Sequence, residues 1–113
     1  MDIQEFDLGA LRCPDMQIKL RTFLKAWVQG NQMKGQKIVV RSIDPRFLDN
    51  VRLYLVNEPA MKHVRLIQDG TQPLSEGLKQ EIISSPDSIY AFSLDDFDGC
   101  NFAYAVLLEF SGE

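Results

Sequence analysis

The middle of the sequence contains the run Lys37-Ile38-Val39-Val40-Arg41-Ser42, in which three β-branched residues follow one another. An unbroken run of this kind is typical of a strand buried at the centre of a sheet. Asp44-Pro45 follows closely and combines a helix N-cap residue with a proline suited to the first turn. We therefore predict a central strand over residues 37–42 and a helix from Asp44 to about Val56.

Before this strand, the spacing of apolar residues predicts an amphipathic helix over residues 14–28. Arg21 and Lys25 lie opposite the apolar stripe, and Gly30 is a typical stop signal. The partly alternating residues 3–8 predict a short strand that leads into this helix. The core-facing residues are predicted to be Met16, Leu20, Phe23, Leu24 and Trp27 in the first helix, and Phe47, Leu48, Val51 and Leu55 in the second.

A third strand is predicted over residues 63–67, followed by a turn at Asp69-Gly70. A third helix is expected after this turn and before Pro86. Its apolar residues recur every four positions, and they are Leu74, Leu78 and Ile82.

The last two predicted strands cover residues 89–94 and 102–110, with a turn at Asp98-Gly99 between them. The predicted order is therefore β-α-β-α-β-α-β-β. Strands and helices that alternate in this way predict an α/β fold of the α+β type, a two-layer sandwich with helices on one face of a mixed sheet.

The composition is typical of one globular domain, because 45% of the 113 residues are hydrophobic and 25% are charged. No stretch approaches the ~20 apolar residues of a membrane span. The acidic start, residues 1–5, lacks the apolar core of a signal peptide. Two cysteines, Cys13 and Cys100, do not make a disulfide scaffold. We therefore expect a cytoplasmic protein with no membrane partner.

Charge is distributed unevenly along the chain. Residues 1–57 carry nine basic and six acidic side chains, and residues 58–113 carry three basic and ten acidic ones, which together give the net charge of −4. The asymmetry is typical of a protein whose halves face different partners, and it also arises by chance in acidic proteins. Because the basic residues do not cluster with aromatic ones, nucleic acid is not an expected partner.

The sequence feature that points to chemistry is Leu8-Gly9-Ala10-Leu11-Arg12-Cys13-Pro14-Asp15. Cys13 directly precedes a proline at the predicted start of a helix. Unpaired N–H groups and the helix dipole stabilise a thiolate there, which lowers a cysteine pKa. Arg12 adds positive potential if its side chain turns toward the sulfur. The alternative is that Cys13 is a small buried core residue.

This string resembles the leading motif of the TusA/SirA-like sulfur carriers, and the likeness extends over about residues 5–57. The resemblance implies a small cytoplasmic protein with a β-α-β-α-β-β sandwich and no cofactor. It also implies that Cys13, supported by Arg12, Pro14 and Asp15, carries a persulfide between partner proteins such as a cysteine desulfurase and a downstream acceptor. A sulfurtransferase role is therefore one hypothesis for this chain.

Two features depart from that family. Met16 stands where the family's Cys-Pro-x-Pro motif has its second proline, although Met16 also fits the helix stripe. After about residue 69, a helix and a longer C-terminal hairpin are predicted as additions to the single domain of residues 1–113. Both departures keep a second hypothesis open, a non-catalytic interaction or regulatory module on the same fold.

Other candidate residues have simpler interpretations. Asp95, Asp96 and Asp98 lack the spacing of a calcium loop, so a solvated turn is expected there. His63 has no acid or nucleophile beside it in the sequence, and no metal site is expected. Cys100 has no local activating charge, so we expect it to be structural rather than a resolving partner of Cys13.

Overall fold

The computed structural model describes residues 3–12, 14–30, 35–84 and 92–111, which form four strands, three α-helices and two short 3-10 helices. The first half of the chain contains β1 (Gln4–Asp7), α1 (Asp15–Gly30), β2 (Lys37–Ser42), α2 (Phe47–Asn57) and η1 (Pro59–Met61). The second half contains β3 (Val64–Pro73), α3 (Glu76–Ser84), η2 (Leu94–Phe97) and β4 (Phe102–Phe110). The predicted mixed α/β fold is confirmed.

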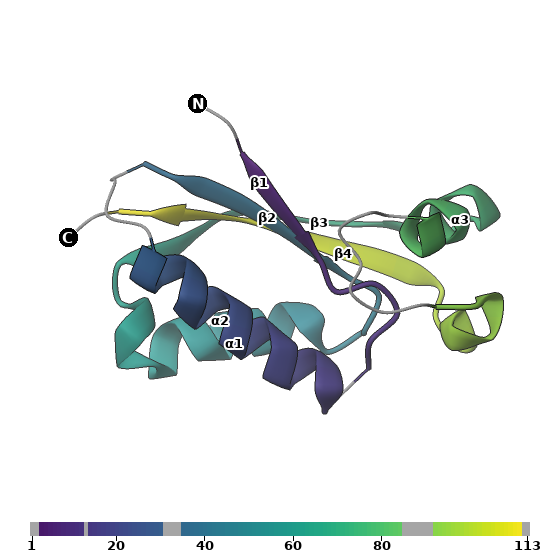
Figure 1. Ribbon diagram of the computed structural model, residues 1–113, viewed down its shortest axis with the longest axis horizontal. Helices are drawn as coiled ribbons and strands as arrows, with labels where there is room; N and C mark the ends of the chain where they lie inside the picture. The colour runs from purple at the N-terminus through teal and green to yellow at the C-terminus, as the bar shows by residue number, and fades with distance from the viewer. Residues whose placement is uncertain (1–2, 13, 31–34, 85–91, 112–113) are drawn as a thin grey trace.

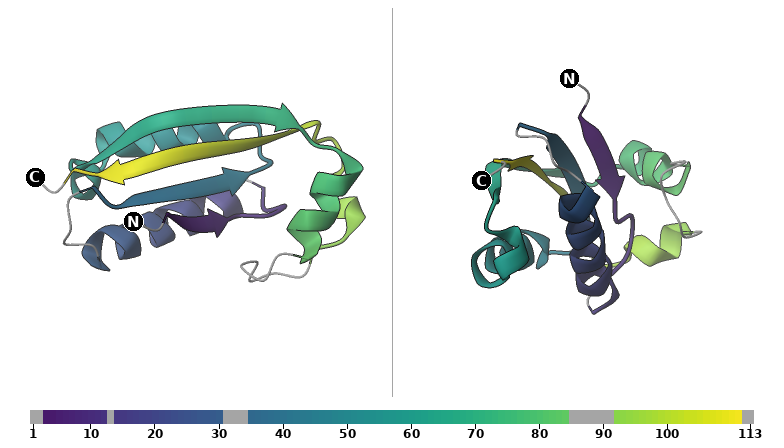
Figure 2. Two further views of the ribbon diagram at one scale, coloured as in Figure 1. Left: turned by 90° about the horizontal axis from the view of Figure 1, so that it is seen from above. Right: turned by 60° about the vertical axis from the view of Figure 1, so that its left-hand side comes forward.

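The sheet has the strand order β1-β2-β4-β3 (Figure 1). β1 and β2 are parallel, whereas β4 is antiparallel to both of its neighbours. β2 is therefore a central strand, as its β-branched run predicts. Its alternate residues Ile38 and Val40 are fully buried, whereas Val39 between them is only half-buried. The reason is that successive side chains of a strand point to opposite faces, and the helices α1 and α2 cover one face alone (Figure 2).

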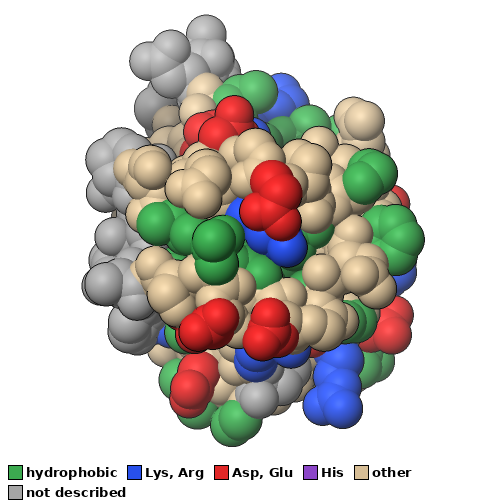
Figure 3. Space-filling model, turned by 90° about the vertical axis from the view of Figure 1, so that its right-hand side faces the viewer, with side chains coloured by type: hydrophobic (Ala, Val, Ile, Leu, Met, Phe, Trp, Pro, Cys, Tyr) green, Lys and Arg blue, Asp and Glu red, His purple; other side chains and the backbone are tan. Residues whose placement is uncertain are grey.

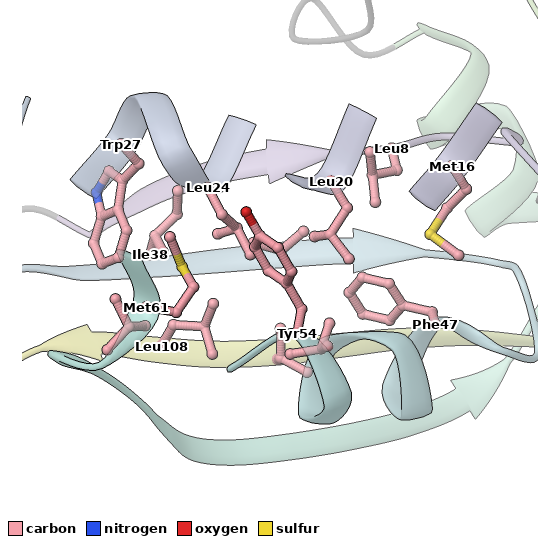
Figure 4. Close-up of a cluster of buried hydrophobic side chains, with 14 of the residues drawn as sticks. Leu8, Met16, Leu20, Leu24, Trp27, Ile38, Phe47, Tyr54, Met61 and Leu108 are labelled. Atoms are coloured by element: carbon pink, nitrogen blue, oxygen red, sulfur yellow. The ribbon is translucent and has the colours of Figure 1, made fainter. Parts of the chain in front are cut away.

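The main core lies between that face and the helices α1 and α2. Figure 4 shows four side chains of α1 arranged in sequence order along the sheet, and all four are buried: Met16, Leu20, Leu24 and Trp27. The predicted stripe of α1 is thus confirmed. Phe23, its fifth member, is only partly buried and stacks on Phe6 of β1 at the edge of the sheet. None of the described helices is long and apolar enough to cross a membrane.

Helix α2 starts later than predicted. Asp44 accepts the Arg46 N–H with its side-chain Oδ1 at 2.8 Å and the Phe47 N–H with its carbonyl at 2.9 Å. Asp44 thus closes a turn that precedes the helix, and Arg46 occupies the N-cap position. The buried face also includes Tyr54, which the sequence pattern omits, while the predicted Leu48 and Leu55 are only partly buried.

The predicted turn at Asp69-Gly70 is wrong, because both residues belong to β3 and pair with Val106 and Ala105 of β4. β3 is ten residues long and contains a register shift between Leu66 and Gln68. Turn-forming residues are accommodated there because pairing with a long neighbouring strand outweighs their local preference. Asp69 also forms an ion pair with Arg52 of α2, at 2.6 Å.

The chain between β3 and β4 forms a separate structural unit, which we call the inserted segment (described over residues 74–84 and 92–101). It contains the predicted third helix, α3, and the 3-10 helix η2. Figure 1 shows both at one end of the sheet. The inserted segment contributes Leu74, Ile82, Phe97 and Cys100 to a second, smaller core cluster. The rest of the chain contributes Ala10, Ile43 and Ala103 to the same cluster.

The first half of the predicted strand over residues 89–94, residues 89–91, lies outside the described residues. The second half of the prediction is wrong, because residues 92–93 form no strand and Leu94 begins η2. β4 has β2 on one side and β3 on the other, so its hairpin partner is β3 rather than this segment. The predicted turn at Asp98-Gly99 is confirmed, and Gly99 has a φ of +81° there.

Candidate functional site

The candidate site is built on the loop that leads from β1 to α1. Cys13 itself lies outside the described residues, so the site is described by the residues that precede and follow it. The Leu8 N–H donates to the Arg41 carbonyl at 2.9 Å, which continues the pairing of β1 with β2 by one residue. The Leu8 side chain is buried in the main core. The loop therefore begins from a fixed point at the end of β1.

Gly9 is the residue at which the chain turns away from the sheet. Its φ is +61°, a conformation that glycine adopts without cost. The Gly9 N–H donates to Oδ1 of Asp7 at 2.7 Å, and the Phe92 ring occupies the space that a Cβ on Gly9 would need. Two features therefore require glycine at position 9: its positive φ, and the Phe92 ring, which leaves no room for a Cβ.

Arg12 turns toward the inserted segment. Its Nη2 donates to the Asp98 carbonyl at 2.6 Å and lies 3.5 Å from the Asp96 carbonyl. Both carbonyls belong to the end of η2, where exposed C=O groups carry partial negative charge. The guanidinium is thus already engaged by the protein's own backbone.

Pro14 and Asp15 lie at the start of α1, as the sequence predicts. The Arg12 carbonyl accepts the Met16 N–H at 2.8 Å, and the Pro14 carbonyl accepts the Ile18 N–H at 3.1 Å. Pro14 and Asp15 are both exposed, whereas Met16 is fully buried in the main core. Met16 thus fills a core position, and its N–H makes a hydrogen bond that a proline at this position could not make.

Cys100 belongs to the second core cluster, where its side chain is 7% exposed. Burial raises the pKa of the Cys100 thiol, and the nearby Asp44 raises it further, although the positive charges of Arg12 and Lys79 lower it. A buried thiol of raised pKa is a poor nucleophile. The prediction that Cys100 is structural is consistent with this environment.

The acidic residues of η2 stabilise their own turn. Asp96 accepts the Ser93 N–H at 2.8 Å in a capping box, which is a structural role. Among the described residues, no group of three or more His, Cys, Asp or Glu side chains could hold a metal ion. Figure 3 shows that acidic side chains on this end of the molecule are scattered among basic and hydrophobic ones.

His63 lies at the opposite end of the sheet from η2. Its carbonyl accepts hydrogen bonds from the Ser111 N–H and hydroxyl at 2.6 and 2.8 Å, and its ring packs edge-on against Phe110. These contacts give His63 a structural role at the end of β4.

A small pocket of about 80 Å³ lies between α3 and the sheet. Charged side chains from three elements line it, namely Asp7, Arg41 and Glu81. A larger groove of about 390 Å³ runs between α1 and α2, lined by Arg21, Tyr54 and Glu58 among others. Neither feature is visible in the sequence, because each combines residues that are distant along the chain.

No protein-family model matches this chain, and neither a curated protein nor a solved structure matches it.

Proposed function

We propose that the protein is a sulfur carrier in which Cys13 holds a persulfide and passes the outer sulfur to a partner protein. The observation that carries this proposal is the string Leu8-Gly9-Ala10-Leu11-Arg12-Cys13-Pro14 between β1 and α1. Without α3 and the 3-10 helices, the described elements follow the order β-α-β-α-β-β that the resemblance to the TusA/SirA-like carriers implies. The inserted segment is then an addition between the last two strands.

The proposed transfer is a thiolate exchange that needs no external oxidant. The Cys13 thiolate attacks the outer sulfur of a persulfide on the donor protein. The S–S bond of the donor breaks, the donor cysteine leaves as a thiolate, and a new S–S bond forms on Cys13. The same exchange then moves the sulfur atom to the acceptor cysteine.

The start of α1 supports this chemistry. Helix α1 begins at Asp15, two residues after Cys13, and a helix N-terminus stabilises negative charge through its unpaired N–H groups and its dipole. The carboxylate of Asp15 opposes this effect, but its exposure to water weakens the repulsion.

Access by a partner protein is supported by the surface around the start of α1. Pro14 and Asp15 are exposed, and the apolar Ile18, one turn further along α1, is 60% exposed. An exposed apolar side chain beside a reactive group is suited to a protein partner that covers it during transfer.

The test is to incubate the protein with a cysteine desulfurase and cysteine, and to measure the intact mass. The expected result is a gain of one sulfur atom, which a thiol reductant removes. Cys13→Ser should abolish the gain, and Cys100→Ser should retain it as the matched control. A protein that gains no sulfur, or gains it equally in Cys13→Ser, contradicts the proposal and favours the non-catalytic interaction module.

A further inference from the structure

We infer that Arg12 is a positioning residue through which the inserted segment holds the loop of the proposed sulfur-transfer site. The role in transfer rests on the proposed function, whereas the coupling between the two segments follows from their contacts. Arg12 and Asp98 are 86 positions apart in the sequence, and the 2.6 Å hydrogen bond joins the loop before Cys13 to the end of η2.

The hydrogen bond between the Arg12 guanidinium and the Asp98 carbonyl has a charged donor. A guanidinium that donates to a carbonyl forms a charge-assisted hydrogen bond, which is stronger than a bond between neutral groups. The acceptors are carbonyls at the end of a helical turn, where positive charge is favourable. Both contacts come from Nη2, so a lysine ammonium at this position would reproduce part of them.

Two apolar contacts join the same two segments independently of Arg12. The Phe92 ring lies against the backbone of Gly9. Ala10 is buried in the second core cluster together with Phe97 and Cys100. Gly9, Ala10 and Arg12 therefore contact the inserted segment, whereas Leu11 between them packs against the main core.

The inserted segment is itself fixed on the side that meets the loop. The Ser93–Asp96 capping box closes the start of η2, and the Cys100 N–H donates to the Phe97 carbonyl at 3.0 Å. The Phe97 side chain is 1% exposed in the second core cluster. The acceptor carbonyls of Arg12 are thus presented by a packed unit.

Thiolate exchange requires close alignment of the reacting atoms, so a loop that moves lowers its rate. Loss of the Arg12 contact should free the loop and η2 together while the main sheet stays intact. Faster motion of the loop and η2 alone would indicate a positioning role for Arg12, whereas a general loss of stability would affect every segment.

Hydrogen exchange of Arg12→Met tests the coupling without any sulfur chemistry. Amides of residues 9–12 and 94–100 should exchange roughly tenfold faster or more, because the opening of both segments is easier, while the Val39 amide of β2 keeps its rate. Arg12→Lys should lie between wild type and Arg12→Met. The matched control is Lys62→Met, which removes an exposed charge just after η1 and should change neither segment.

Phe92→Ala is the second variant, and it serves if Arg12→Met does not fold. It removes the ring beside Gly9 and leaves Arg12 in place, and it should speed exchange in the same two segments. Unchanged exchange in folded Arg12→Met overturns the inference. If Arg12→Met does not fold, unchanged exchange in Phe92→Ala overturns the coupling of the two segments, and equally faster exchange in β2 does so in either variant.

The functional measurement is the rate at which persulfide-loaded protein transfers sulfur to a small thiol acceptor. Arg12→Met should transfer several-fold more slowly than wild type, and Arg12→Lys should recover part of the rate. If the wild type gains no sulfur but Arg12→Met speeds hydrogen exchange in both segments, the proposed function fails and the coupling between the segments stands. If wild type transfers sulfur and Arg12→Met does so at the same rate, the positioning role fails.

Discussion

The rings of Phe6 and Phe23 stack with their centroids 3.7 Å apart and their planes 3° from parallel. Phe6 belongs to β1 and Phe23 to the middle of α1, so this pair joins the two elements on either side of the candidate site. β1 is an edge strand of only four residues, with β2 as its partner in the sheet. The stacked pair therefore attaches β1 to the helix layer.

Phe23→Ala should lower the free energy of unfolding by about 2 kcal/mol, because it removes a partly buried ring and its aromatic partner contact. Phe23→Leu keeps apolar volume and should cost only about 1 kcal/mol. Urea denaturation of both variants measures the difference. Equal costs for the two would show that the stacking geometry contributes nothing beyond apolar burial.

The inserted segment should depend on Phe97, which is 1% exposed in the second core cluster. Phe97→Ala should destabilise the fold by about 3–5 kcal/mol, the usual cost of removing a buried aromatic side chain. Leu94, in the same 3-10 turn, is 46% exposed and provides the matched control. Leu94→Ala should change stability by less than about 0.5 kcal/mol. A small effect of Phe97→Ala would mean that the segment packs only loosely on the rest of the protein.

Alkylation by iodoacetamide should separate the two cysteines. Burial raises the pKa of the Cys100 thiol, so at pH 8 little of it is thiolate. The Cys13→Ser variant, which retains Cys100, should therefore react on the order of a hundredfold more slowly when folded than when unfolded in urea. The Cys100→Ser variant reports on Cys13, whose pKa should lie below the ~8.5 of a free thiol if the carrier proposal holds. Fast reaction of folded Cys13→Ser at pH 8 would contradict the burial of Cys100.

Glu109 should make stability depend on pH in the acid range. Its hydrogen bonds from Arg65, with Lys37 nearby, hold the pKa of the Glu109 carboxyl below its ordinary value of 4.5. The folded protein therefore binds fewer protons at this group than the unfolded chain does. The stabilisation is present above pH 4.5 and is lost as the pH falls through the lowered pKa of the folded state.

Glu109→Gln and Arg65→Met should each flatten the pH dependence of the unfolding free energy below pH 4.5, when measured by urea denaturation at a series of pH values. High salt should have a similar effect on the wild type, because Arg65 is exposed. A slope that persists unchanged in both variants would assign the acid sensitivity to other carboxylates.

Local sequence patterns predicted the helices and strands that bury one face, because their apolar residues repeat at a regular spacing. The α1 stripe from Met16 to Trp27 and the β-branched run of β2 were both confirmed, because a helix or strand that buries one side must repeat apolar residues at its own period. The resemblance to the sulfur carriers rests mainly on the contiguous string Leu8–Pro14, and it stays a prediction. The start of α1 near Pro14 follows from the same local rules.

The tertiary structure decided the contacts that join distant parts of the chain. The local preference of Asp69-Gly70 is for a turn, but their pairing with β4 makes them part of a strand. The partner of Arg12 is a backbone carbonyl 86 positions away, and a carbonyl leaves no trace in side-chain sequence. The close approach of Phe92 to Gly9 is equally invisible, because the two residues meet only once the inserted segment has folded against the loop. Local sequence sets the period of each element, but long-range packing determines which residues of different elements touch.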